Sequence, residues 1–426
     1  MTNWQNILLK EWEIRDKNRK KKNSNPYFPL VDEMIDVSEI AAAIETLLGS
    51  QLTMGEQVRL FENEFAQSLN VENAVMVNSG SSAALLAIAV ITNKLRTQHL
   101  NIGEEVIVPA VCWPSAIWPL VLHGLRIRFV DVDPSTLNMD PDSFEKAVND
   151  QTRGVLAVHI LGNSTQMDRC TEICERYNLI LIEDTCESLG SSAFGNKLGT
   201  YGDFGFFSFY YSHHITTGEG GAVICGSAED YEILKCLRAH GWTRSQLNKG
   251  KIEQTYPNID PRFLFYNVGY NFRPLEVSGA IGRVQLRKIE QMNAARVHNW
   301  KALRRTLINH PRWREQLTFP KASKGTDPVW FGFPFLLHQN YIKERNNYSK
   351  WLSNNGVENR PIVSGNVLRQ PVIKQMNINQ DPKSFPGAEA VHSGLFIGLH
   401  STKLSQKTIS NLTDILLGYD FGQQTS

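Results

Sequence analysis

Residues 204–225 read FGFFSFYYSHHITTGEGGAVIC, in which two short apolar runs enclose a polar loop. The loop carries two adjacent histidines, several hydroxyl side chains and three glycines. Short apolar runs bounded by glycine or polar residues are typical of buried strands. The segment therefore predicts two buried strands joined by a loop whose side chains are suited to chemistry.

Five further apolar runs precede this segment along the chain. They are AVMVN (74–78), EVIVP (105–109), RIRFVDV (126–132), GVLAVHI (154–160) and LILIED (179–184). Between them, SFEKAVND and DRCTEICERYN have the spacing of amphipathic helices. This alternation predicts an α/β fold with a mostly parallel sheet that helices cover.

The C-terminal part of the chain has a different pattern. After a long helical stretch at 284–307, the chain continues with VWFGFPFLL (329–337), a polar helix and short segments. A chain of 426 residues, 42% of them hydrophobic, is long enough for two unequal domains. We therefore expect an N-terminal arm (1–30), a large domain (31–296) and a small C-terminal domain (297–426).

The net charge and the lack of long apolar segments indicate which partners and which cellular location to expect. A formal net charge of +1 gives no long-range field for nucleic acid or anionic lipid, so small-molecule partners are expected. The first residues lack the apolar core of a secretory signal, and no stretch is long and uncharged enough to span a bilayer. We therefore expect a cytoplasmic protein that does not cross a membrane.

The six cysteines include no CxxC pair, so reduced thiols and no metal site are expected. Cys170 and Cys174 share one face of a predicted helix. They are either buried helix residues, which we favour, or part of a metal or cluster site.

Polar residues follow two of the apolar runs, where a parallel sheet places its ligand site. Gly80 and Ser81 follow the run AVMV and begin a helical stretch, either as a phosphate cradle or as an ordinary helix start. Asp184 ends the run LILIED. Its carboxylate can pair with a protonated ring nitrogen or cap the next turn.

His213 and His214 occupy the polar loop between the last two runs. Histidine titrates near neutrality and can both take and give a proton. An arbitrary histidine pair favours a structural role. The surrounding hydroxyls and glycines favour a catalytic one here.

Four segments resemble motifs of the DegT/DnrJ/EryC1/StrS sugar aminotransferase family, and they occur in the family's order. They are NSGSSAAL (78–85), IEDTCESLG (182–190), FFSFYYSHHITTGEGGAV (206–223) and GYNFRPLEVSGAIGRVQL (269–286). The resemblance implies the aspartate aminotransferase fold type I, with a mixed, mostly parallel seven-stranded sheet in the large domain and a smaller C-terminal α+β domain. It also implies pyridoxal 5'-phosphate (PLP) or pyridoxamine 5'-phosphate (PMP) as the cofactor.

One position departs from the family pattern. Where the family has its cofactor-anchoring lysine, this sequence has His213, and an imidazole cannot replace the primary amine in the covalent bond to PLP. This departure resembles a branch of the family that uses PMP to remove the C3 hydroxyl of nucleotide-linked 4-keto-6-deoxy sugars. The resemblance implies that His213 is the catalytic acid and base, and that L-glutamate regenerates PMP.

Part of this branch adds a two-iron cluster bound by closely spaced cysteines and works with a reductase. The corresponding segment here, LRAHGWTRSQLNKGK (237–251), has no cysteine. The resemblance therefore favours the mode of action without a cluster.

The resemblance also assigns residues to the cofactor. Gly80, Ser81 and Ser208 are expected to hold its phosphate, and Trp113 is expected to stack on its pyridine ring. Asp184 is expected to keep the ring nitrogen protonated, so that the ring remains an electron sink.

Two further positions lie within the family motifs. Glu187 stands where aminotransferase relatives usually have glutamine, which fits the dehydratase branch. Asn271 matches a residue that reaches the phosphate in the neighbouring subunit, which implies a homodimer with shared active sites.

The residues that bind the sugar nucleotide are less clearly marked. His214, Arg360 and His392 are candidate contacts to the sugar or diphosphate, since arginine in particular donates paired hydrogen bonds to phosphate. Each also has a structural interpretation, as an ion pair or a helix-end charge. The same alternatives hold for the polar residues Arg273, His240, Arg369 and His400.

Two other functions remain open at this stage. A sugar aminotransferase would have to tolerate the lost lysine or use another, such as Lys197, which lies too far before the motif for a simple replacement. A noncatalytic relative would bind the cofactor or a nucleotide sugar without turnover. The retained GEGG turn and Asp184 argue against such a relative.

Overall fold

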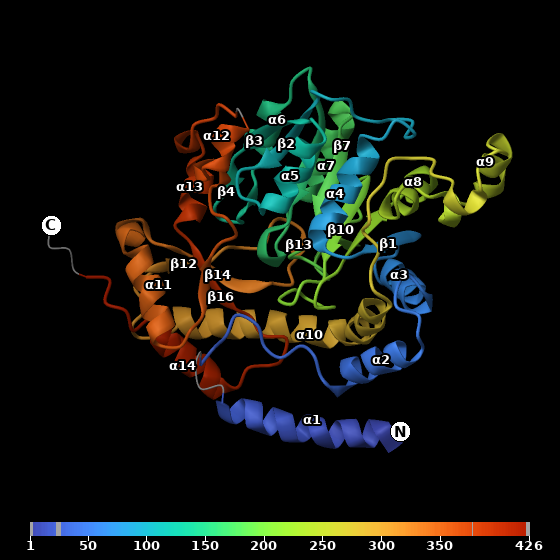
Figure 1. Cartoon of the computed structure of the whole chain (residues 1–426). Coiled ribbons are helices and arrows are strands. Elements are labelled where there is room, and N and C mark those ends of the chain that lie inside the picture. Colours follow the sequence, from blue (N-terminus) through green and yellow to red (C-terminus); the bar gives the residue numbers. More distant parts are fainter. Residues whose placement is uncertain (1–2, 23–26, 377, 423–426) are drawn as a thin grey trace.

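A seven-stranded sheet forms the centre of the molecule. The computed structural model describes residues 3–22, 27–376 and 378–422. The strands lie in the order β1-β11-β10-β7-β6-β2-β3 (Figure 1). Their bounds are Asn73–Val77 (β1), Glu105–Pro109 (β2), Arg126–Val130 (β3), Thr152–Val158 (β6), Ile180–Asp184 (β7), Phe204–Ser208 (β10) and Gly221–Cys225 (β11). Of the seven strands, β11 alone runs opposite to the other six, so the predicted mixed, mostly parallel sheet is confirmed.

Both faces of this sheet are buried, which explains the continuous apolar runs in the sequence. In β1, Ala74 and Met76 belong to one core cluster, whereas Val75 and Val77 belong to another. Successive side chains of a strand point to opposite faces. Apolar residues are therefore needed at every position of a strand with helices on both sides.

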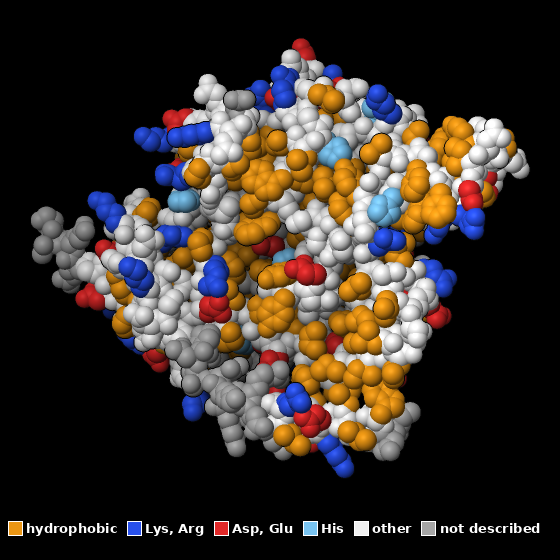
Figure 2. Space-filling view, viewed as in Figure 1, with side chains coloured by type: hydrophobic (Ala, Val, Ile, Leu, Met, Phe, Trp, Pro, Cys, Tyr) orange, Lys and Arg blue, Asp and Glu red, His pale blue; other side chains and the backbone are white. Residues whose placement is uncertain are grey.

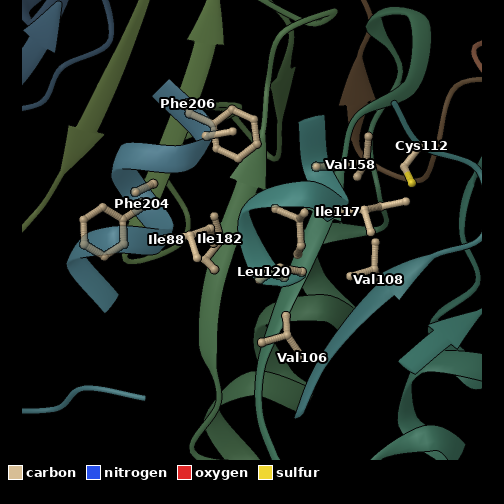
Figure 3. Close-up of a cluster of buried hydrophobic side chains, with 14 of the residues drawn as sticks. Ile88, Val106, Val108, Cys112, Ile117, Leu120, Val158, Ile182, Phe204 and Phe206 are labelled. Atoms are coloured by element: carbon tan, nitrogen blue, oxygen red, sulfur yellow. The ribbon is translucent and has the colours of Figure 1, made fainter. Parts of the chain in front are cut away.

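Helices cover the two faces separately. The face of Val75 and Val77 packs against α4 (Gly80–Ile91), α5 (Pro114–Leu122) and α8 (Ala228–Arg238). Figure 3 shows part of this core, in which Ile88 and Ile117 from the helices belong to one cluster with Val106, Ile182 and Phe204 from the strands. The other face packs against α3 (Glu56–Ser68), α6 (Pro141–Ala147), α7 (Met167–Tyr177) and α10 (Glu276–Ile308).

Cys170 and Cys174 lie in α7 and are buried in this second core. They are therefore core residues of a helix, the interpretation that the sequence favoured. Within the described ranges, no group of three His, Cys, Asp or Glu side chains is arranged to hold a metal ion.

The C-terminal part forms a second, four-stranded sheet in the order β12-β14-β16-β15. Its strands and main helices are Leu317–Thr318 (β12), Gly332–Leu337 (β14), Asn359–Pro361 (β15), Leu395–Gly398 (β16), Arg345–Asn354 (α11) and Gln406–Leu416 (α14). Phe333 and Tyr348 pack in its core with Leu303 and Leu307 from the end of α10. The helix α10 continues without a break through residue 296, where the domain division was expected. The division therefore stays a prediction.

The predicted N-terminal arm contains α1 (Asn3–Lys22), which precedes α2 (Val37–Leu48). Gln5 Nε2 in α1 donates to Glu45 Oε1 in α2 at 3.1 Å. The remaining helices and strands are short: Val132–Asp133 (β4), Asn138–Met139 (β5), Ser192–Ala193 (β8), Asn196–Lys197 (β9), Lys249–Thr255 (α9), Thr326–Asp327 (β13), Val372–Gln375 (α12) and Pro386–His392 (α13). Of the helices described, none is long and apolar enough to cross a membrane.

Candidate active site

A cavity of about 380 Å³ opens where β1, β2, β6, β7 and β10 end. The carboxyl ends of parallel strands lie at one edge of a sheet, so residues that are distant in the sequence meet there. Two residues of the C-terminal part, Phe331 and Val363, complete the lining. Seven of the predicted site residues line this one cavity: Gly80, Ser81, Trp113, Asp184, Glu187, Ser208 and His213.

The start of α4 approaches the end of β10 more closely than any side chain at residue 80 would allow. A Cβ added to Gly80 would lie 2.5 Å from the Ser208 Cβ and 2.7 Å from its Oγ. Ser79 caps the helix, since its Oγ accepts from the Ser82 N–H at 3.0 Å. The first N–H groups of a helix have no partner within it and attract anions. Glycine and two hydroxyls at this helix start therefore fit a phosphate group.

Two carboxylates lie at the end of β7. Asp184 Oδ1 accepts from the Cys186 N–H at 3.1 Å, and burial raises the pKa of Asp184 despite this hydrogen bond. Glu187 Oε2 accepts from the Leu161 N–H at 2.9 Å. Burial raises the pKa of Glu187 to about 7, with the charge of Asp184 adding to the effect. Asp184 thus makes the local turn contact anticipated from the sequence and still lines the cavity.

His213 is held in the loop after β10 by its backbone, because its N–H donates to the Tyr210 carbonyl at 3.0 Å. Its ring packs edge-on against Phe331, with 5.4 Å between the centroids. Its Nδ1 is buried and has no hydrogen-bond partner among the described residues. Burial, aided by the positive charge of Arg296, lowers the pKa of His213 to about 4. The imidazole is therefore neutral at pH 7 and able to accept a proton.

The donor set of the cavity matches a phosphorylated pyridine. The helix start at Gly80 fits a phosphate, and Asp184 offers a carboxylate to a protonated ring nitrogen. Trp113 is 58% exposed and lines the same cavity, so its indole is available for stacking. The residues that line the cavity thus fit the phosphate, the ring nitrogen and the ring face of PLP or PMP.

The other predicted site residues lie outside the cavity lining. His214 is buried, and its Nε2 lies 3.0 Å from the Val329 carbonyl oxygen. Arg360 donates to Glu358 at 2.7 Å, and His392 Nδ1 accepts from the Asn366 N–H at 3.3 Å. Asn271 is exposed and accepts from Arg273 Nε at 2.9 Å. Their roles toward substrate or a partner subunit stay predictions.

Four further polar residues singled out in the sequence do not line the cavity: Arg273, His240, Arg369 and His400. Arg369 pairs with Glu389, and His400 Nε2 lies 3.1 Å from the Pro29 carbonyl oxygen. His240 packs edge-on against Trp242. These contacts favour the structural interpretation for those residues.

Several residues at or beside the cavity were not predicted from the sequence. His159 lines the cavity and directly follows β6, within the run GVLAVHI, so the rule that strand ends hold the ligand site pointed to it. Phe331 and Arg296 come from elements far along the chain, and no local pattern linked them to His213.

Comparisons with known proteins agree with this architecture. The model of the DegT/DnrJ/EryC1/StrS aminotransferase family matches residues 33–416. GDP-4-keto-6-deoxy-D-mannose 3-dehydratase of Yersinia pseudotuberculosis is 39% identical over 394 residues, which cover 91% of this chain and 98% of the relative. The structure of the Escherichia coli GDP-4-keto-6-deoxy-D-mannose-3-dehydratase with bound hydrated PLP superposes with a TM-score of 0.84 at 37% identity, covering 91% of this chain and 99% of that one.

A second similar solved structure contains an adduct of PLP with glutamate. It is a GDP-4-keto-6-deoxymannose-3-dehydratase with a trapped PLP-glutamate geminal diamine, with a TM-score of 0.84 at 37% identity over 91% of this chain and 100% of that one. The fold and the cavity define this chain as an aspartate aminotransferase fold type I protein. Within that class, it belongs to the DegT/DnrJ/EryC1/StrS aminotransferase family.

Proposed function

We propose that the protein is a PMP-dependent 3-dehydratase that removes the C3 hydroxyl of GDP-4-keto-6-deoxy-D-mannose and uses L-glutamate to regenerate its cofactor. The observation that carries the proposal is His213, which stands in the cavity where the family motif has lysine. The names of the relatives support the substrate, and the trapped glutamate adduct in a relative supports the amino donor.

Gly80, Ser81 and Ser208 would hold the cofactor phosphate, and Trp113 would stack on the ring. When bound, PMP supplies a primary amine for the C4 ketone and a protonated ring that accepts negative charge. Asp184 would hold the proton at the ring nitrogen, since its carboxylate provides the opposite charge within the cavity.

His213 would move the proton of the reaction. Its neutral imidazole would take a proton from the carbon that carries the cofactor's amine, and would then donate this proton to the C3 oxygen of the sugar as the carbon–oxygen bond breaks. Because the pKa of His213 is low, the imidazolium is a strong acid and gives the proton up readily. Phe331 packs against the ring and limits the directions in which it can move.

The Glu187 carboxyl group would be present in the cavity in its protonated or its ionised form, depending on the pH. Its pKa of about 7 places both forms in the physiological range. A carboxyl group can donate a hydrogen bond only in its protonated form. Glutamine, the usual residue of the aminotransferase relatives, donates at any pH.

The test is turnover of GDP-4-keto-6-deoxy-D-mannose by the protein with PLP and L-glutamate, followed by mass spectrometry of the sugar. We expect a product that lacks one oxygen atom and carries no nitrogen. A 4-amino sugar would identify an aminotransferase instead. Cofactor binding without turnover of this sugar or of its CDP-linked analogue would support the noncatalytic relative.

We also propose a homodimer in which Asn271 of one subunit reaches the cofactor phosphate of the other. Figure 2 shows apolar side chains gathered over much of one face of the molecule. In the segment before Asn271, Phe265 is 52% and Val268 is 90% exposed, which is unusual for large apolar residues. A cytoplasmic location stays a prediction.

Mixing two inactive variants tests the shared site. His213→Asn and Asn271→Ala subunits would each be inactive alone. A mixed dimer has one cavity with both native residues, so mixing should restore part of the activity. A monomer in light scattering, or no recovery from a dimer that exchanges subunits, would contradict the proposal.

A further inference from the structure

Arg296 is a buried cation in α10, with 2% of its surface exposed. Its Nη1 donates to the carbonyl oxygens of Phe331 at 3.0 Å and Leu399 at 2.6 Å. Its Nε has no hydrogen-bond partner within the residues that the structure describes. Among the described residues, the hydrogen bonds of the Arg296 guanidinium thus go to neutral carbonyl groups.

Other buried arginines of this chain are paired with acids. Arg96 donates to Asp230 at 2.8 Å, and Arg238 donates to Glu62 at 2.5 Å. Among the described residues, Arg296 forms no such ion pair. The negative charge of Asp32 stabilises the Arg296 charge without forming an ion pair with it. The Asp32 carboxylate accepts hydrogen bonds from Ser401 and Thr402 instead. A buried charge without a paired acid destabilises the fold, and such destabilising features concentrate at functional sites.

The surroundings of Arg296 point to the active site. Phe331, whose carbonyl it binds, lines the cavity and packs against both His213 and His214, with centroid distances of 5.4 and 5.9 Å. The Nδ1 atoms of both histidines are buried without a partner in the described part of the chain. The positive charge of Arg296 opposes the protonation of both imidazoles.

We propose that Arg296 is a positioning residue of the active site, which fixes Phe331 against the His213 ring and opposes the protonation of that ring by its charge. The inference rests on the proposed role of His213 as the catalytic base. It gives a reason for the unpaired arginine: an acid placed beside Arg296 would cancel the charge that opposes the protonation of His213.

Other charged and titratable groups near His213 also affect its protonation. Asp184, Glu187 and Glu219 line the same cavity and would favour a protonated His213 when ionised. His214 adjoins it in the loop, and Tyr210 packs against it. Burial is the larger cause of the lowered His213 pKa, and Arg296 is the second. Loss of the arginine charge should therefore raise the midpoint only part of the way to the ordinary value of 6.5.

The test is the protonation midpoint of His213, measured by histidine hydrogen–deuterium exchange with mass spectrometry on the cofactor-free protein. Arg296→Gln keeps N–H donors for the two carbonyls but removes the charge, whereas Arg296→Lys keeps the charge. We expect Arg296→Gln to raise the midpoint by about one pH unit, a ten-fold change in the protonation equilibrium. The midpoint of the Arg296→Lys variant should stay within about a few tenths of a pH unit of the wild-type value. The acid limb of the kcat/KM profile should move with the midpoint.

Arg238→Gln is the matched control, because it removes a buried arginine that is 4% exposed and lies in α8. It should lower the melting temperature without moving the His213 midpoint. An unchanged midpoint in a folded Arg296→Gln protein would overturn the inference, as would an equal shift in Arg296→Lys or Arg238→Gln. The midpoint is measured without substrate, so a protein that failed to dehydrate the sugar would contradict the proposed function and leave this test intact.

Discussion

Replacing Glu187 with glutamine should change how the stability of the protein depends on pH. Burial raises the pKa of Glu187 from 4.5 to about 7, so the folded state favours the protonated form. This stabilisation is complete below pH 4.5, the ordinary pKa, and is lost as the pH rises through 7. At about 1.4 kcal/mol per pH unit, the full effect is about 3 kcal/mol. Glutamine keeps an acceptor for the Leu161 N–H and cannot ionise.

The assay is urea unfolding of the cofactor-free wild type and Glu187→Gln variant at pH 5 and pH 8. The stability of the variant relative to the wild type should increase by about 2–3 kcal/mol between these pH values. Glu219→Gln, an exposed carboxylate in the same cavity, controls for the loss of one negative charge. A difference between wild type and Glu187→Gln that is the same at both pH values would refute the reasoning.

Three further substitutions have defined outcomes. His213→Lys should lose dehydration and gain a covalently bound cofactor with amino-sugar formation, seen by absorbance and product mass; unchanged dehydration would count against the role of His213. Gly80→Ala should weaken PLP affinity about ten-fold or more by equilibrium titration, because the added Cβ meets Ser208; an unchanged Kd would exclude the phosphate cradle. Arg96→Met should lower the free energy of unfolding by about 3–5 kcal/mol, because it leaves buried Asp230 unpaired; a loss below about 1 kcal/mol would contradict this.

The strands of the main sheet could be predicted because both faces of the sheet are buried. Each of the seven apolar runs contains a strand, from β1 at Asn73–Val77 to β11 at Gly221–Cys225. The reversed direction of β11 and the order of the strands could not be deduced from the runs, since an apolar run has no direction and does not name its neighbours. The resemblance to the family supplied the seven-stranded, mixed character of the sheet.

The site was predictable where position along a strand determines position in space. Asp184 and Ser208 end parallel strands, so both reach the same edge of the sheet. His214 shows the limit of this reasoning, because it adjoins His213 in the sequence and yet points to the Val329 carbonyl. Arg296 lies in the middle of a long helix, and its link to the cavity depends on contacts with Phe331 and Leu399 that no local pattern reveals.

The fate of nitrogen in the reaction tests the central claim most directly. The protein would be incubated with PLP, ¹⁵N-labelled L-glutamate and GDP-4-keto-6-deoxy-D-mannose, and the label would be followed in ammonia and in the sugar. The account predicts one labelled ammonia for each 3-deoxy sugar formed, with no nitrogen in the sugar. Label retained on the sugar at C4, with the C3 oxygen intact, would contradict it.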